Sequence, residues 1–194
     1  MNSGKNINVV IFGGNGYIGN SIIKKWLEKD QKTVFFSISR SGKGQITNPN
    51  VHYLKADVTD FEQVQSVLPG SVDYIIDCVG IYTKDREQLR KYNLLPAKVM
   101  LEIADKKSVK GLGYIGGVMG PEAFKNSKAS VIQMLCSSKH NISYVEPTLV
   151  YGNGRSDALS KMVPLLKIAG IFSKKMKPVE VNDLADELIS KLIK

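Results

Sequence analysis

Residues 8–19 of the chain read NVVIFGGNGYIG, a mostly apolar run followed directly by a stretch rich in glycine. The β-branched residues of this run and its end at Gly13 predict a buried strand over residues 8–12. From Tyr17 onward, apolar residues recur at the spacing of a helix. A strand, a glycine turn and a helix in this order are typical of a loop that binds phosphate groups.

The glycines of this loop have different expected tasks. Gly13 allows a tight exit from the strand, Gly16 lets the backbone approach a pyrophosphate, and Gly19 lets the helix pack against the sheet. The helix N-terminus adds unpaired N–H groups and the positive end of its dipole. The alternative is a glycine-rich turn with a structural task only. The residues expected to bind a dinucleotide here are Gly13, Asn15, Gly16, Tyr17, Ile18 and Gly19.

The rest of the chain alternates between short β-branched runs and longer segments of helical period. This alternation predicts βαβ units, and therefore an α/β protein with a three-layer, doubly wound Rossmann fold and a mostly parallel sheet. The expected strands cover residues 8–12, 33–39, 51–55, 74–79, 112–115 and 142–146. The expected helices begin at residue 17 and then cover residues 61–68, 86–105, 125–138 and 159–167.

A last helix is expected near the C-terminus, where apolar residues share one face. These residues are Val181, Leu184, Ala185, Leu188, Ile189, Leu192 and Ile193. Asn182 is a candidate cap for this helix, and Pro96 is expected to kink the helix over residues 86–105.

The composition indicates one soluble domain over residues 1–194, with a short C-terminal extension from about residue 153 onward. No stretch approaches the roughly 20 apolar residues that a membrane span needs. Cys78 and Cys136 form no disulfide or metal-binding pattern, so we expect a reduced, cytoplasmic protein without a metal site.

The formal net charge of +9 raises the question of a polyanionic partner. The lysines are scattered, and the densest cluster contains only Lys174, Lys175 and Lys177. No basic stripe with interleaved aromatic residues accompanies them. We therefore do not expect nucleic acid to be the partner.

The residues at the end of the second strand are expected to determine whether NAD(H) or NADP(H) binds. NAD-selective domains carry an acidic residue about 20 positions past the glycine loop, where it binds the ribose 2′-hydroxyl. Residues 36–41 read FSISRS and contain no acid. Arg40 is expected to bind a 2′-phosphate through its guanidinium, and Ser39 or Ser41 is expected to donate a hydrogen bond to it. Lys43 is a weaker candidate for the same contact. NADP(H) is therefore favoured over NAD(H) as the cofactor. The alternative is that Arg40 is a solvated surface residue without a role in binding.

The GxxGxxG spacing of the loop resembles that of the short-chain dehydrogenase/reductase superfamily, in its extended and atypical, epimerase-like branches. The segments ADVTD at residues 56–60, EPTLVYG at 146–152 and PVEVNDLA at 178–185, together with Asn93, are similar to motifs of those branches. The resemblance implies that Asp57 and Val58 contact adenine. It also implies that the ribose and nicotinamide are bound by Cys78, Val79, Gly80, Lys128 and Pro147.

Catalysis is where the sequence departs from this family. Active members carry a serine after the fifth strand and a Tyr-x-x-x-Lys motif on the next helix. Here Gly116 and Gly117 follow the strand, Phe124 takes the place of the tyrosine, and Lys128 fits the lysine. Tyr82 and Tyr151 follow other strand ends and are candidates to replace the missing tyrosine as proton donor. The alternative is that each only lines the pocket.

Two functions remain open at this stage. The first is an NADP(H)-dependent oxidoreductase with a non-standard site, acting on a small conjugated or carbonyl acceptor. The alternative is a non-catalytic sensor of the dinucleotide or an assembly subunit. Extended family members carry a larger C-terminal substrate domain, whereas only residues 153–194 follow Gly152 here. We therefore expect a substrate site that is shallow or completed by a second chain, which leaves a homodimer open.

Overall fold

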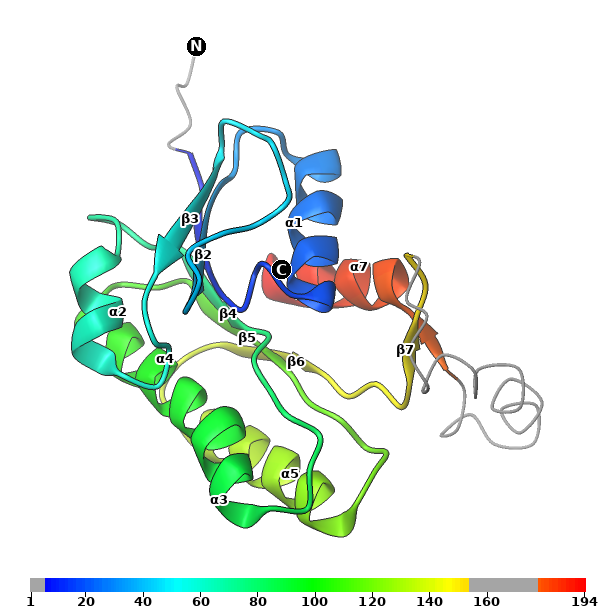
Figure 1. The fold of residues 1–194 in the computed structure, drawn as a ribbon. Helices are drawn as coiled ribbons and strands as arrows, with labels where there is room; N and C mark the ends of the chain where they lie inside the picture. The colour runs from blue at the N-terminus through cyan, green and yellow to red at the C-terminus, as the bar shows by residue number, and fades with distance from the viewer. Residues whose placement is uncertain (1–5, 154–177) are drawn as a thin grey trace.

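The computed structural model describes residues 6–153 and 178–194. Its centre is a six-stranded sheet in which every neighbouring pair of strands is parallel (Figure 1). The strand order is β3-β2-β1-β4-β5-β6, the doubly wound order of a Rossmann fold. The strands are β1 (Asn8–Phe12), β2 (Val34–Ser39), β3 (Val51–Lys55), β4 (Tyr74–Asp77), β5 (Gly111–Ile115) and β6 (Ile142–Val145). The expected fold class is confirmed.

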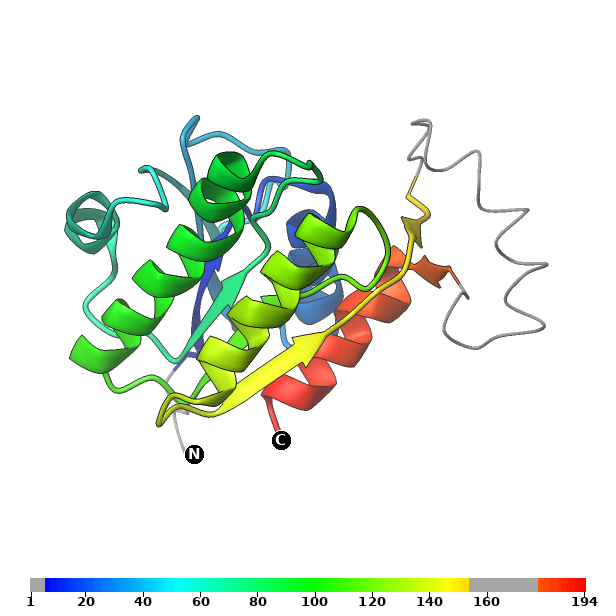
Figure 2. The ribbon, with the colours of Figure 1, turned by 90° about the horizontal axis from the view of Figure 1, so that it is seen from below.

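Helices cover both faces of this sheet (Figure 2). One face packs against α1 (Tyr17–Lys29) and α7 (Val181–Leu192). The other packs against α2 (Phe61–Val67), α4 (Leu95–Lys106) and α5 (Glu122–Cys136). Strand β1 is buried on both sides, which explains its unbroken apolar run: Val9 and Ile11 face the first layer, and Val10 and Phe12 face the second.

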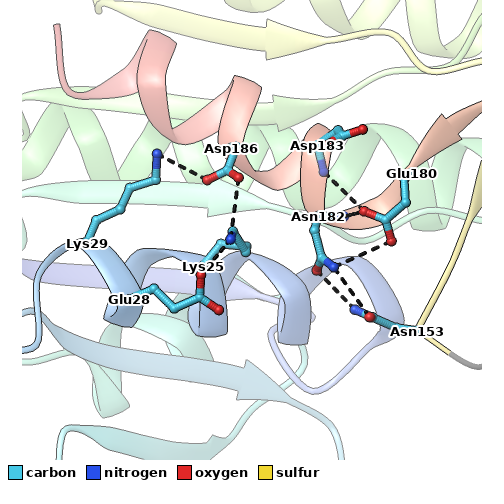
Figure 3. A network of polar contacts seen from close by, with 8 residues as sticks. All are labelled: Lys25, Glu28, Lys29, Asn153, Glu180, Asn182, Asp183 and Asp186. Atoms are coloured by element: carbon cyan, nitrogen blue, oxygen red, sulfur yellow. Dashed lines mark hydrogen bonds and ion pairs between the residues drawn. The ribbon is translucent and has the colours of Figure 1, made fainter.

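The apolar face of α7 attaches this helix to the sheet and to α1. Leu184, Leu188 and Ile189 are almost completely buried, and each such side chain contributes roughly 1.5–3 kcal/mol of burial free energy. Asp186 also pairs with Lys25 at 3.6 Å and with Lys29 at 3.1 Å (Figure 3). These ion pairs are partly exposed and add little to stability by comparison.

The cap of α7 corrects one expectation. Glu180, not Asn182, caps this helix: its Oε2 atom accepts the N–H of Asn182 at 2.6 Å and that of Asp183 at 3.3 Å. The helix begins at Val181, so Asn182 already lies within its first turn. The Asn182 side chain instead accepts a hydrogen bond from Asn153 Nδ2 at 3.1 Å (Figure 3).

The helical region after β4 is less regular than a kinked helix. It consists of α3 (Arg86–Leu89), a π-helical turn η1 (Arg90–Leu94) and then α4. In the π turn the N–H of Leu95 reaches back to the carbonyl of Arg90. Pro96 follows in the first turn of α4 and has no N–H of its own. The wider π turn accommodates a proline ring that would crowd the preceding turn of an α-helix.

A small second sheet extends beyond β6. Strands β7 (Val150–Tyr151) and β8 (Val179–Glu180) pair in parallel, an element that was not expected. The helix expected over residues 159–167 and the lysine cluster at 174–177 lie outside the described residues. Within residues 6–153 and 178–194, no helix is long and apolar enough to cross a membrane.

Candidate functional site

The glycine loop lies at the point where the strand order reverses, between β1 and its neighbours β2 and β4. Gly13 has a φ of +74°, a conformation that favours glycine, and its carbonyl accepts the N–H of Gly16 at 2.9 Å. Gly16 is the N-cap of α1 and offers no side chain to cap it. A helix start without a capping side chain is suited to bind phosphate oxygens.

The glycine loop packs closely against the start of α1. A Cβ atom on Gly19 would lie 2.5 Å from the carbonyl oxygen of Gly13 and 2.6 Å from the Cα of Gly14. One on Gly16 would lie 3.1 Å from the same oxygen of Gly13. The loop and the start of α1 therefore pack backbone against backbone, which requires glycine at residue 19.

Asn15 ties the loop to the segment after β2. Its Nδ2 atom donates to Ser41 Oγ at 3.3 Å and to the carbonyl of Lys43 at 3.0 Å. The hydroxyls of Ser39 and Ser41 lie 3.3 Å apart beside it. Two hydroxyl groups and the start of the glycine loop thus come together at the edge of the site.

Arg40 is exposed at the end of β2, with its guanidinium carbon 5.7 Å from the centroid of the Tyr92 ring. Lys91 approaches the same ring at 5.5 Å. Tyr92 could not be expected here from sequence pattern, because it belongs to the π turn on a different part of the chain. Arg40 therefore has a cation–π partner in the π turn.

Asp57 and Val58 follow β3 at the same edge. The Oδ1 atom of Asp57 accepts the N–H of Thr59 at 3.0 Å and its hydroxyl at 2.8 Å. Val58 is 7% exposed and packs into the core. The Val58 side chain therefore belongs to the core and is not available to a ligand at this edge.

A pocket of about 300 Å³ opens at the carboxyl ends of β4, β5 and β6. Ligands in open α/β sheets bind at such strand ends. The pocket unites several residues that were expected to contact the cofactor or substrate. They are Ile18, Cys78, Val79, Gly80, Tyr82, Phe124, Lys128 and Pro147, joined by Gly116, Gly117, Met119 and Leu149.

Lys128 forms the polar floor of the pocket. It is 4% exposed, and its Nζ donates to the carbonyl of Ile115 at 3.0 Å. The same atom lies 4.8 Å from the centroid of the Tyr114 ring. Burial lowers the pKa of Lys128 to about 8, although the negative charge of Asp77 acts in the opposite direction.

Asp77 is a site residue that was not among those expected from the sequence. It is fully buried at the end of β4, where its Oδ1 accepts the N–H of Val79 at 2.8 Å. Burial raises its pKa to about 7, against the opposing effect of the Lys128 charge. The available signal was an acid closing the otherwise apolar strand that begins Tyr74-Ile75-Ile76.

Cys78 lines the pocket beside Asp77. Burial raises the pKa of the Cys78 thiol, and the Asp77 carboxylate raises it further. A thiol in this state is a poor nucleophile at neutral pH. In residues 6–153 and 178–194, no three His, Cys, Asp or Glu side chains are arranged to hold a metal ion.

An aromatic pair covers the other side of the pocket. The rings of Phe124 and Tyr82 lie 5.2 Å apart with an interplanar angle of 51°. Phe124 is 9% exposed, whereas Tyr82 is 55% exposed. Tyr151 packs near Met119 and Leu149 and does not line the pocket. Of the two tyrosines considered as acids, Tyr82 is the one that lines it.

Two further hydrogen bonds connect segments around the site. Asn93, buried in the π turn, accepts the N–H of Ile81 at 2.8 Å and so holds the loop after β4. The hydroxyl of Tyr17 donates to the carbonyl of Gly152 at 2.9 Å, which joins the start of α1 to the segment after β7. Tyr17 therefore connects the glycine loop to the far side of the pocket.

The fold and site define a nucleotide-binding Rossmann protein, and the sequence identifies its family. Residues 9–118 match the NAD dependent epimerase/dehydratase family. The match spans more than half of the chain, so this protein belongs to that family. This confirms the resemblance to the epimerase-like branch of the short-chain dehydrogenase/reductase superfamily and supports a nicotinamide dinucleotide as cofactor. No curated protein matches the sequence.

Several solved structures have a similar fold. A short chain dehydrogenase family protein from Francisella tularensis is 18% identical, with a TM-score of 0.71 over 97% of this chain and 91% of that one. The Bordetella bronchiseptica enzyme WbmH, solved in complex with NAD+, is 17% identical, with a TM-score of 0.73 over 96% of this chain and 72% of that one. ElxO with NADP bound is 19% identical, with a TM-score of 0.71 over 97% and 92% of the two chains.

Proposed function

We propose that this protein is an NADP(H)-dependent reductase that acts on a small conjugated or carbonyl acceptor. The observation that carries the proposal is the pocket of about 300 Å³, where the start of α1, Gly80 and Lys128 meet at the ends of three strands. A cofactor held along the glycine loop would reach this pocket, and an acceptor would occupy the rest of it.

The chain offers a group for each part of the dinucleotide. The glycine loop and the start of α1 would hold the pyrophosphate, and the edge at Asp57 and Val58 would receive the adenine. When bound, a reduced nicotinamide supplies a hydride. The groups that would surround the ribose and nicotinamide are Ile18, Cys78, Val79, Gly80, Lys128 and Pro147.

The edge at β2 supports a preference for NADP(H). Arg40 supplies a planar cation, and its neighbours in sequence, Ser39 and Ser41, supply two hydroxyls that lie 3.3 Å apart. Asn15 ties this group to the glycine loop. Since residues 36–43 contain no carboxylate, a 2′-phosphate would meet attraction without a repelling charge.

The pocket wall supports a conjugated acceptor. Phe124 has no proton to donate, and the loss of a positioned general acid costs on the order of 10²–10⁴ in rate. This loss matters most for a carbonyl, which becomes an alkoxide, and less for an acceptor that spreads the charge. Tyr82 and Phe124 offer aromatic surface to such an acceptor, and the Tyr82 hydroxyl is the candidate donor at the pocket.

A second function is favoured by one specific observation. Phe124, Gly116 and Gly117 all line the pocket, and none of their side chains carries a hydroxyl. A sensor or assembly subunit would need the dinucleotide site but no proton relay. In that case the protein would bind NADPH and oxidise none of it.

A measurement of NADPH turnover distinguishes the reductase from the sensor or assembly subunit. NADPH oxidation should be measured with a panel of quinones, flavins and activated carbonyls, with NADH as the parallel donor. The reductase proposal expects oxidation with at least one conjugated acceptor and faster rates with NADPH. Tight NADPH binding without oxidation across the panel would contradict it and favour the sensor.

A further inference from the structure

Three polar side chains lie beneath the pocket, between the sheet and α5. Asp77 on β4 and Tyr114 on β5 are direct partners in the parallel ladder, so their side chains lie on the same face of the sheet. Lys128 reaches this face from α5, with its Nζ above the Tyr114 ring. All three residues are at most 4% exposed. Such groups are costly to bury unless their charges and hydrogen bonds are compensated.

The ammonium group of Lys128 needs a negative charge at this depth. Its hydrogen bond goes to the neutral carbonyl of Ile115, and the Tyr114 ring adds a cation–π contact. The titratable groups that face it are Asp77, Cys78 and Tyr114. Burial raises the pKa of both the Cys78 thiol and the Tyr114 phenol, so both are neutral near pH 7. Asp77 is therefore the source of negative charge.

The carboxylate of Asp77 is held in a way that suits this task. The N–H of Val79 fixes its Oδ1 atom at 2.8 Å. Its Oδ2 atom is buried and has no hydrogen-bond partner among the residues that the structure describes. One oxygen thus sets the orientation of the carboxylate, while the charge is left to act on Lys128 through a region of low dielectric constant.

We propose that Asp77 is a positioning residue, a buried counter-charge that keeps Lys128 in its ammonium form beneath Gly80. Within the proposed function, this ammonium would hold the ribose of the dinucleotide. Phe124 has no ionisable group, so it cannot supply a negative charge to the lysine. The charge relation between Asp77 and Lys128 itself does not depend on which ligand binds.

The direct test is the titration of Lys128 by NMR, with ¹³C at the lysine Cε atoms. The Lys128 signal is assigned by its loss in Lys128→Met. In the native chain it should titrate near pH 8. In Asp77→Asn its pKa should fall by roughly 1–3 units, the effect of losing an opposite charge nearby. Asp105→Asn removes an exposed carboxylate of α4 and should leave the titration unchanged. An unchanged pKa in Asp77→Asn would overturn the proposal.

A reciprocal measurement covers the case in which Asp77→Asn does not fold. In Lys128→Met the pKa of Asp77, followed through its ¹³Cγ signal, should rise above its native value of about 7. A value that stays the same would also overturn the proposal.

Cofactor binding gives a second readout that a merely structural role would not move. The Kd for NADPH should weaken on the order of fivefold as the native Lys128 loses its proton. In Asp77→Asn the midpoint of this change should move to lower pH by the same roughly 1–3 units. Equal weakening at every pH would indicate a structural role and contradict the proposal. If the native chain binds no dinucleotide, the proposed function fails, and the lysine titration still decides the role of Asp77.

Discussion

The Nζ atom of Lys128 lies 2.8 Å from the position that a Cβ atom on Gly80 would occupy. The Oδ1 atom of Asn93 lies 3.2 Å from the same position. The absence of a side chain at residue 80 therefore lets the lysine reach the pocket floor and lets Asn93 hold the adjoining loop. This relationship makes Gly80 a sensitive position in the site.

Gly80→Ala should displace the end of Lys128 and weaken NADPH binding by about tenfold, the loss of one hydrogen bond from a charged group. Gly70→Ala is the matched control, since a Cβ there meets no atom within 4 Å. Both variants should be titrated with NADPH by calorimetry. Equal affinities in the two variants would show that the lysine does not act on the cofactor.

Substitutions of Gly16 and Gly19 should affect different properties, ligand binding for Gly16 and stability for Gly19. Gly16→Val should abolish dinucleotide binding, because a branched side chain would intrude where the backbone is proposed to meet the pyrophosphate. It should change the free energy of unfolding by only about 1 kcal/mol, because a Cβ there meets the carbonyl oxygen of Gly13 at 3.1 Å and no other described atom within 4 Å. Gly19→Ala should lower stability, since its Cβ would meet backbone atoms at 2.5 and 2.6 Å that cannot rotate away. Urea unfolding and NADPH titration of both variants check this. Native affinity in Gly16→Val would mean that the loop is only structural.

Arg40→Asp should reverse the preference between the two dinucleotides. The substitution replaces a cation by a carboxylate, which repels a 2′-phosphate and accepts hydrogen bonds from a ribose hydroxyl. Arg86→Asp makes the same charge change on exposed α3 and should preserve the preference. The Kd values for NADPH and NADH are compared at physiological salt. A preference unchanged by Arg40→Asp would exclude Arg40 from recognition.

The sequence was most informative where local pattern decides structure. The apolar run before Gly13 predicted both ends of β1, and the spacing after Tyr17 predicted the start of α1. Family motifs led to the pocket at Gly80 and Lys128. The predicted cap of α7 was wrong because the helix begins two residues earlier than a cap at Asn182 requires, so Glu180 is the capping residue.

The parts of the site that could not be predicted from the sequence depend on contacts between distant segments. The contact of Tyr17 with Gly152 joins residues 135 positions apart, and no periodicity reports it. Tyr92 meets Arg40 only because the π turn places it beside the end of β2. The role of Asp77 depends on its burial and its neighbours, which the sequence does not reveal.

The raised pKa of Asp77 predicts a pH dependence of stability. Its folded pKa of about 7 lies above the ordinary value of 3.8, so the folded state binds a proton that the unfolded state has lost between these pH values. The free energy of unfolding should therefore fall as pH rises from about 4 to 7, by a few kcal/mol at most. Urea unfolding at pH 5 and pH 7 measures this fall, which should be absent in Asp77→Asn. A fall of the same size in that variant would assign it to other groups.

Phe124→Tyr should create, or measurably raise, NADPH-dependent reduction of small activated carbonyls. The new phenol would stand on the pocket wall near the Lys128 ammonium, which lowers its pKa and readies it to donate a proton. The gain should be modest, because Gly116 and Gly117 still supply no hydroxyl to hold the carbonyl oxygen. Lys128→Ala should weaken NADPH binding in either background. No rate gain from Phe124→Tyr would count against catalytic geometry in this pocket.

The central claim is that a nicotinamide dinucleotide, NADP(H) in preference, binds along the glycine loop and reaches the pocket above Lys128. Calorimetric titration of the native chain with NADPH and with NADH, at physiological salt, tests it most directly. We predict saturable one-site binding of NADPH, at least about tenfold tighter than that of NADH, as a charge-assisted contact to the 2′-phosphate implies. Comparable Kd values for the two dinucleotides, or no binding of either, would contradict the account.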